Sequence, residues 1–131
     1  MLDRLESQVF SLIKAKFSPT LKKNYPDLNF TTSDRAATEP KFPTVYVHLT
    51  GTTEAGETLE GTSVNAISTM FQIEVTDNQS QGRADEVAKE VLRVMKTMRF
   101  DTKMFPEHMN TGDVYRTVAQ YRRKIGSEDI L

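Results

Sequence analysis

Residues that could support catalysis are scarce in this chain. It contains two histidines and no cysteine. His48 and His108 lie far apart and belong to neither a His-x-x-x-His nor a His-Glu-x-x-His pattern, so no metal-ligand motif is present. The glycines lack the spacing of a phosphate-binding loop, and no Gly-x-Ser-x-Gly nucleophile elbow occurs. We therefore expect a non-enzymatic protein that uses no cofactor and no metal.

The basic and aromatic residues near the C-terminus form the first candidate site: Arg116, Tyr121, Arg122 and Arg123. Arginine and tyrosine are enriched as anchors of subunit interfaces. The same mixture also occurs on nucleic-acid surfaces, and positive charges protect edge strands from aggregation. We favour an oligomer or tube interface, with a solvated edge and a nucleic-acid surface as alternatives. Charge reversal of Arg122 and Arg123 should then reduce assembly.

An acidic segment is the second candidate site. Glu54, Glu57 and Glu60 recur at steps of three within the glycine- and threonine-rich residues 51–62. This composition predicts a long hairpin loop that buries no face of its own. The simplest interpretation is a solvated tip. The alternative is a subunit contact or a pore lining, where negative charge would repel DNA phosphates and discourage sticking.

The first elements along the chain are helical. Apolar residues fall at steps of three and four from Leu2 to Phe17, which predicts an amphipathic helix over residues 2–17. Ser18 and Pro19 can cap and begin a second, short helical turn. The Asn24-Tyr-Pro-Asp segment is then a turn signal.

Three strands are expected to follow. A short strand is predicted at residues 28–32, and alternating β-branched and apolar residues predict two more at 44–50 and 63–76. The last two should pair as an antiparallel hairpin. Residues 33–43, with two prolines, are expected to form a loop.

The C-terminal half is predicted to contain one more helix and one more strand. After Asp77-Asn-Gln-Ser80, an apolar stripe with acidic residues early and basic residues late predicts a helix that runs to about Arg99. Residues 100–112 are expected to be irregular, with Phe105 and Met109 dipping into the core. Residues 114–125 favour a strand ended by a glycine, although a short helix from Asp113 also matches their spacing.

The order of these elements is α-β-β-β-α-β. It predicts an α+β fold in which an antiparallel sheet carries two helices on one face. The 131 residues suit a single domain. Apolar residues make up 37% of the chain and the mean hydropathy is −0.49, so we expect neighbours to supply part of the stability.

Overall charge argues against a broad polyanion-binding surface. Lys and Arg number 17 against 18 for Asp and Glu, which gives a net charge of −1. No global positive field would therefore draw the chain onto nucleic acid or anionic lipid. The first residues carry charges and no apolar signal segment, so we expect neither export nor a membrane span.

The C-terminal segment, Asp113-Val-Tyr-Arg-Thr-Val-Ala-Gln-Tyr-Arg-Arg-Lys-Ile-Gly126, resembles the tail terminator and minor tail-completion proteins of tailed bacteriophages. Many of them end in a strand with an arginine followed by an aromatic-Arg-Arg cluster, here Arg116 and Tyr121-Arg122-Arg123. Chain length and element order fit the family as well.

The resemblance implies a structural virion protein without catalytic activity. It would assemble in the host cytoplasm as a homo-oligomeric ring, typically a hexamer, in the tail-neck region of the virion. Its partners would be the tail tube protein and the head-connector or neck proteins, with DNA only as cargo through the ring and no membrane. Another neck or head-closure connector is the nearest alternative.

Two alternatives come from other classes of protein. The α-β-β-β-α portion matches the order of a double-stranded-RNA-binding domain, but that class needs lysines at the start of its second helix. Here this helix begins Gly82-Arg-Ala-Asp-Glu86. A small enzyme would have to use Glu107 and His108, and a pocket with a strongly perturbed side chain there would favour it.

Overall fold

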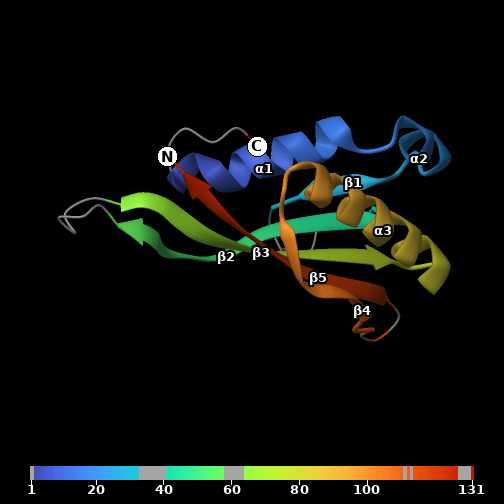
Figure 1. Cartoon of the computed structure of the whole chain (residues 1–131). Coiled ribbons are helices and arrows are strands. Elements are labelled where there is room, and N and C mark those ends of the chain that lie inside the picture. The colour runs from blue at the N-terminus through green and yellow to red at the C-terminus, as the bar shows by residue number, and fades with distance from the viewer. Residues whose placement is uncertain (1, 33–40, 58–63, 111, 113, 127–130) are drawn as a thin grey trace.

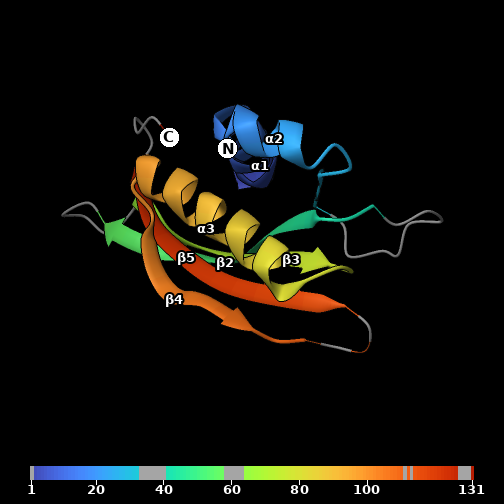
Figure 2. The ribbon, with the colours of Figure 1, turned by 90° about the vertical axis from the view of Figure 1, so that its right-hand side faces the viewer.

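The computed structural model describes residues 2–32, 41–57, 64–110, 112, 114–126 and 131. In this part of the chain a five-stranded sheet carries three helices on one face (Figures 1 and 2). The elements are α1 (Leu2–Lys16), α2 (Pro19–Asn24), β1 (Asn29–Thr31), β2 (Thr44–Glu57), β3 (Val64–Asp77), α3 (Gln81–Thr97), β4 (Asp101–His108) and β5 (Tyr115–Gly126).

The α+β class is confirmed, while the detail of the sheet differs from the prediction. The strand order is β1-β2-β3-β5-β4. All neighbours pair antiparallel except β1 and β2, which are parallel. The expected fully antiparallel sheet is therefore wrong at this edge. A parallel neighbour is possible because the connection from β1 to β2 is long enough to return the chain to the same end of the sheet.

Strand β4 corrects the prediction for residues 100–112. It pairs with β5 along the sheet's outer edge, so the order α-β-β-β-α-β lacks one strand. Pro106 suggests an irregular segment, but an edge strand tolerates proline because its outward N–H groups need no ladder partner. Phe105 and Met109 are 65% and 38% exposed, so the expectation that they enter the core is also wrong.

Strands β2 and β3 are longer than the sequence pattern indicates. Residues 51–57 continue β2, so the predicted loop over 51–62 is wrong for this part, while 58–62 lie outside the described residues. The pairing register shifts at Leu49/Gly51 and at Glu54/Gly56. Such β-bulges accommodate an extra residue without ending a strand, which explains why glycines do not stop β2.

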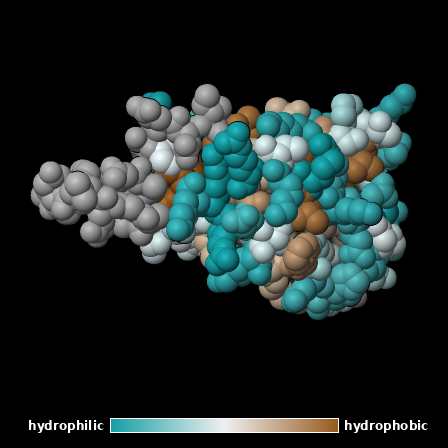
Figure 3. Space-filling view, viewed as in Figure 1, coloured by the Kyte–Doolittle hydropathy of each residue, from teal (hydrophilic) through white to brown (hydrophobic). Residues whose placement is uncertain are grey.

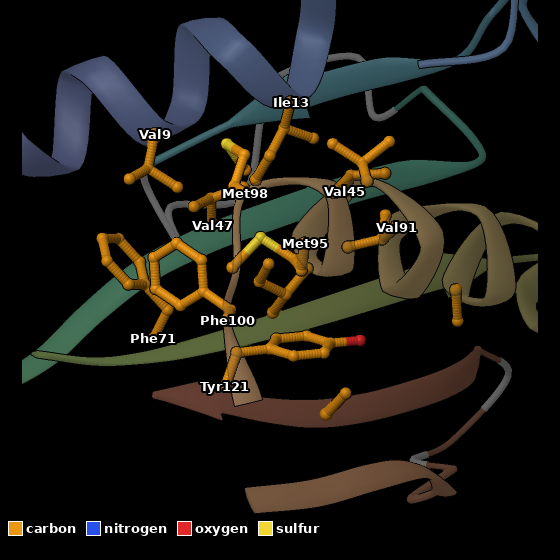
Figure 4. Close-up of a cluster of buried hydrophobic side chains, with 14 of the residues drawn as sticks. Val9, Ile13, Val45, Val47, Phe71, Val91, Met95, Met98, Phe100 and Tyr121 are labelled. Carbon is orange, nitrogen blue, oxygen red and sulfur yellow. The ribbon is translucent and has the colours of Figure 1, made fainter. Parts of the chain in front are cut away.

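The core lies between the sheet and the helices (Figure 4). The predicted stripe of α1 is buried at Leu5, Val9, Ile13 and Phe17. In α3 the buried residues are Ala84, Val87, Ala88, Val91, Val94 and Met95. Helical periodicity therefore identified the two faces that pack on the sheet.

Both ends of α3 are closed by local hydrogen bonds. At its start, Ser80 Oγ accepts from the N–H of Arg83 at 3.2 Å, and buried Asp77 accepts from the N–H of Ser80 at 3.0 Å. At its end, the N–H groups of Arg99 and Phe100 donate to the carbonyls of Lys96 and Met95. These two bonds form a Schellman motif.

Glu90 ties α3 to the junction between α1 and α2. Its Oε2 accepts from the N–H of Ser18 at 2.8 Å and from Arg93, which also donates to the carbonyl of Lys16 at 3.0 Å. The hydrogen bond from Arg93 lowers the pKa of Glu90 below its ordinary value of 4.5. The ionised carboxylate is therefore favoured in the folded state.

Glu90→Gln should reduce stability at neutral pH by about 1 kcal/mol, because a charge-assisted bond becomes a neutral one. A depressed pKa gives stability that is complete above the unfolded value of 4.5 and is lost as pH falls through the folded-state pKa. The difference in unfolding free energy between wild type and variant should therefore become smaller below pH 4.5. Urea unfolding at neutral pH and at about pH 3 measures it, and a gap independent of pH would contradict this role.

Candidate subunit interface

Strand β5 divides the predicted basic and aromatic cluster between two faces of the sheet. Tyr121 and Arg123 point toward the helices and are buried, with 0% and 8% of their surface exposed. Arg116 and Arg122 alternate with them and point to the opposite face. The four residues therefore do not form one continuous contact surface.

Tyr121 belongs to the hydrophobic core, where its ring lies among the buried side chains (Figure 4). Its hydroxyl is buried and has no hydrogen-bond partner among the described residues. Burial raises the pKa of this hydroxyl well above its ordinary value. The side chain contributes packing rather than a contact to another molecule.

Tyr121→Phe should leave the fold intact and raise its unfolding free energy by about 1 kcal/mol, since a desolvated hydroxyl without a partner is removed. Chemical denaturation of both proteins measures the change. A loss of stability of similar size would mean that the hydroxyl does hold a partner, such as a buried water.

Arg123 is held inside the chain by backbone contacts. Its Nη1 donates to the carbonyl of Met98 at the end of α3, at 3.0 Å, and its own carbonyl accepts from the Thr69 hydroxyl at 2.9 Å. A cation at a helix C-terminus is favoured by the helix dipole. Arg123 therefore joins α3 to the sheet, and its side chain is not presented to a partner.

Figure 2 shows that the labelled helices all lie on one side of the sheet, and the opposite side is here called the uncovered face. This face carries a polar network. Arg116 forms an ion pair with Glu74, and Gln120 Nε2 donates to Gln72 Oε1 at 3.1 Å. Val118 lies opposite Glu74 and is only 1% exposed. Long side chains thus close over the one buried apolar residue of β5 on this face.

A stacked aromatic pair extends the uncovered face to β2. The rings of Tyr46 and His48 are stacked, with centroids 5.7 Å apart. His48 is paired in register with Gln72, so the aromatic pair adjoins the polar network. Aromatic rings and hydrogen-bonded amides held on a rigid sheet are suited to contact with another protein surface.

Only part of the acidic segment can be placed. The backbone at Glu54 and Glu57 belongs to β2, so these residues lie on a strand rather than in a loop. Glu60 lies outside the described residues. Whether the segment lines a pore or contacts a subunit stays a prediction.

At the possible enzyme site of Glu107 and His108, the imidazole of His108 makes a surface contact with a carboxylate. His108 Nε2 lies 2.9 and 3.0 Å from the two carboxylate oxygens of Asp85, which also accepts from the hydroxyl of Thr117 at 3.1 Å. That hydroxyl is buried and donates to the carboxylate, so it has no access to a substrate. Within the described ranges, no three His, Asp or Glu side chains are placed to hold a metal ion.

Comparison with known proteins adds no assignment: no family model and no curated protein matches this chain. Among the described residues, no helix has the length and apolar character needed to cross a bilayer. Hydrophilic side chains dominate the side of the molecule seen in Figure 3, where apolar ones form small patches. A contact on this side would be mainly polar.

Proposed function

We propose that this chain is a structural subunit of a tailed-phage virion, a tail terminator that works as a homo-oligomeric ring. The proposal is supported by the resemblance of residues 113–126 to that family. The observation that carries it is the outer edge of β2 beyond Tyr46, with which no strand of the described part of the chain pairs. Such an open edge is a template for pairing with another chain, and native proteins usually protect it.

The open edge begins where β1 and α1 stop covering β2. Strand β1 pairs with β2 only as far as Tyr46, and the carboxylate of Glu6 in α1 accepts from the N–H of Leu49 at 2.9 Å. Beyond this point β2 continues to Glu57 past the helical layer (Figure 1), and residues 51–53 are exposed. Residues 51–57 with residues 64–70 of β3 are called the hairpin arm.

The hairpin arm gains stability if a neighbouring copy covers it. From Ala66 onward the β3 strand of the arm also pairs with β5, so within the described residues the arm lacks a partner strand only along β2. An open edge strand is a template for pairing with another chain. A contact between the arm of one copy and a different surface of the next is heterologous. Such a contact repeats around a ring and closes when the rotation between copies permits.

Closure of the ring accounts for the terminator function. One side of the ring binds the last ring of the tail tube, and the other side differs from a tube subunit, so a further tube ring cannot add. The second side then presents a surface to the head connector. DNA passes through the opening as cargo, and no bond is made or broken.

The test is the mass in solution, measured by light scattering over a concentration series and followed by negative-stain imaging of the largest species. A closed ring, or a monomer that forms one when purified tail tubes of its phage are added, supports the proposal. A monomer at every concentration that does not bind tubes contradicts it.

A further inference from the structure

A cationic hollow lies at the end of the sheet near the C-terminus of α3. It has a volume of about 640 Å³ and is lined by Ser68, Arg99, Asp101, Arg122, Arg123 and Lys124. Four of these residues carry positive charge and one is a carboxylate. Arg123 is buried and donates to the carbonyl of Met98, so Arg99, Arg122 and Lys124 are the cations exposed to a ligand. The hollow is a local concentration of positive charge in a chain whose net charge is −1.

Two segments supply these cations, β5 and the turn between α3 and β4. Arg122 and Lys124 alternate with buried residues on β5, so both point to the uncovered face. Lys124 is paired in register with Ser68 of β3, and Arg122 with Asp101 of β4. Arg99 comes from the turn between α3 and β4. The fold therefore adds Arg99 to the sequence run Arg122-Arg123-Lys124.

Arg99 occupies a backbone conformation that usually belongs to glycine. Its φ is 64°, at the position of the Schellman motif where a left-handed residue follows the helix. Any residue with a Cβ is strained there relative to glycine. A glycine would close α3 with less strain, but it would remove one guanidinium from the hollow.

Three cations of the hollow, Arg99, Arg122 and Lys124, differ in their partners from three arginines elsewhere in the fold. Arg83, Arg93 and Arg116 each form an ion pair with a carboxylate.

In contrast, no side-chain hydrogen bond or ion pair is made by Arg99, Arg122 or Lys124 within the described part of the chain. Arg99, Arg122 and Lys124 are exposed, and they can turn toward a ligand without breaking an existing contact. Unpartnered cations around one hollow are suited to an anion.

We propose that the cationic hollow binds a phosphate group, and that the source of this group is the backbone of a nucleic acid. A phosphate offers tetrahedrally arranged oxygens that separate cations can approach from several directions, and arginine forks match it well. A carboxylate offers two oxygens in one plane and fits fewer of these side chains at once. Local contacts of this kind need no positive field over the whole protein.

Ring assembly is a separate question from this site. The ring proposal uses the outer edge of β2 in the hairpin arm. The phosphate proposal uses the end of β5 and the turn after α3, with Ser68 of β3 as the one lining residue that belongs to the arm. A monomer could bind phosphate, and a ring could form without it. Each proposal can therefore fail without the other.

The test uses the double variant Arg122→Ala/Lys124→Ala in the full chain. Both residues are exposed, so the fold should be retained. The matched control is Arg4→Ala/Lys16→Ala, which removes one arginine and one lysine from exposed positions of α1. Inorganic phosphate is titrated and followed by NMR shifts, and a labelled duplex DNA is titrated by fluorescence anisotropy at several salt concentrations.

We expect the double variant to bind both probes at least about tenfold more weakly than wild type, with the control within about twofold. The plot of log affinity for DNA against log salt has a negative slope. Its magnitude should decrease by about two, one for each lost phosphate contact. Arg99→Gly should also weaken both probes while it relieves backbone strain. If Arg99→Gly is more stable than wild type and yet binds both probes more weakly, the loss of binding cannot come from a damaged fold.

The other outcomes overturn the proposal wholly or in part. Binding of inorganic phosphate without DNA would overturn the nucleic-acid source and assign the hollow to a small phosphate compound. Equal binding by the double variant and the control would mean that the hollow is not a phosphate site. If a glutamate-rich peptide binds at the hollow and phosphate does not, the ligand is an acidic protein segment instead.

Discussion

Shortening the hairpin arm should abolish ring formation while the monomer stays folded. In this variant Asn-Gly replaces residues 55–66, so that a two-residue turn joins Glu54 and Ile67, which are partners in the β2–β3 register. Asn-Gly is the preferred sequence for such a turn. Residues that pack on the core, including Ile67, are retained. We expect the unfolding free energy of the monomer to change by about 1 kcal/mol or less.

The two readouts are independent. Light scattering and negative-stain imaging measure the ring, and urea unfolding measures the monomer. Rings that form normally from the shortened chain would contradict the role of the arm. A large loss of monomer stability would instead mean that the arm belongs to the chain's own core, and the open edge of β2 would then lose its significance as an assembly surface.

Local sequence patterns predict the helices and most strands of this fold. The stripes of α1 and α3 have the helical period, and both stripes are buried as expected. Ser18 caps α2 as predicted, with the N–H of Leu21 donating to its hydroxyl at 3.4 Å. In β5 the predicted strand replaces the alternative helix. These elements depend on neighbours only a few residues away, which the sequence displays directly.

Features that depend on distant contacts were harder to predict. Strand β4 exists because β5 supplies its hydrogen bonds. Its apolar residues follow one another along the chain, with Phe105 exposed and Pro106 half-buried, so the sequence gives no alternation of apolar residues. Glycines predict that β2 ends near residue 50, but pairing with β3 continues it to Glu57. In both cases a neighbouring strand outweighs the local preference.

The candidate site shows the same limit. Alternation along β5 places Tyr121 and Arg123 together on one face, but it does not reveal that the helices cover this face. Arginine is rarely buried unless its charge finds a partner. Arg123 finds one in the carbonyl of Met98, which belongs to another element. The left-handed backbone conformation of Arg99 is not predictable from the sequence, because glycine is the residue type that normally indicates such a position.

The two neighbouring arginines of β5 should respond very differently to the same change. Arg123→Glu puts a carboxylate in a nearly enclosed position, where it faces the carbonyl of Met98 at the negative end of α3. The helix dipole opposes a negative charge at this end. The unfolding free energy should fall by about 3 kcal/mol or more, as it does for other unpaired buried charges.

Arg122→Glu is the matched control, since it makes the same charge change one residue away on an exposed side chain. It should cost about 0.5 kcal/mol or less. Urea unfolding of the two variants measures the difference. Charge reversal at Arg123 would then reduce assembly only because the subunit unfolds, whereas a stable, unassembled Arg123→Glu protein would restore Arg123 as a direct interface anchor. Equal stability of the two variants would contradict the burial of Arg123 and the contact that joins α3 to β5.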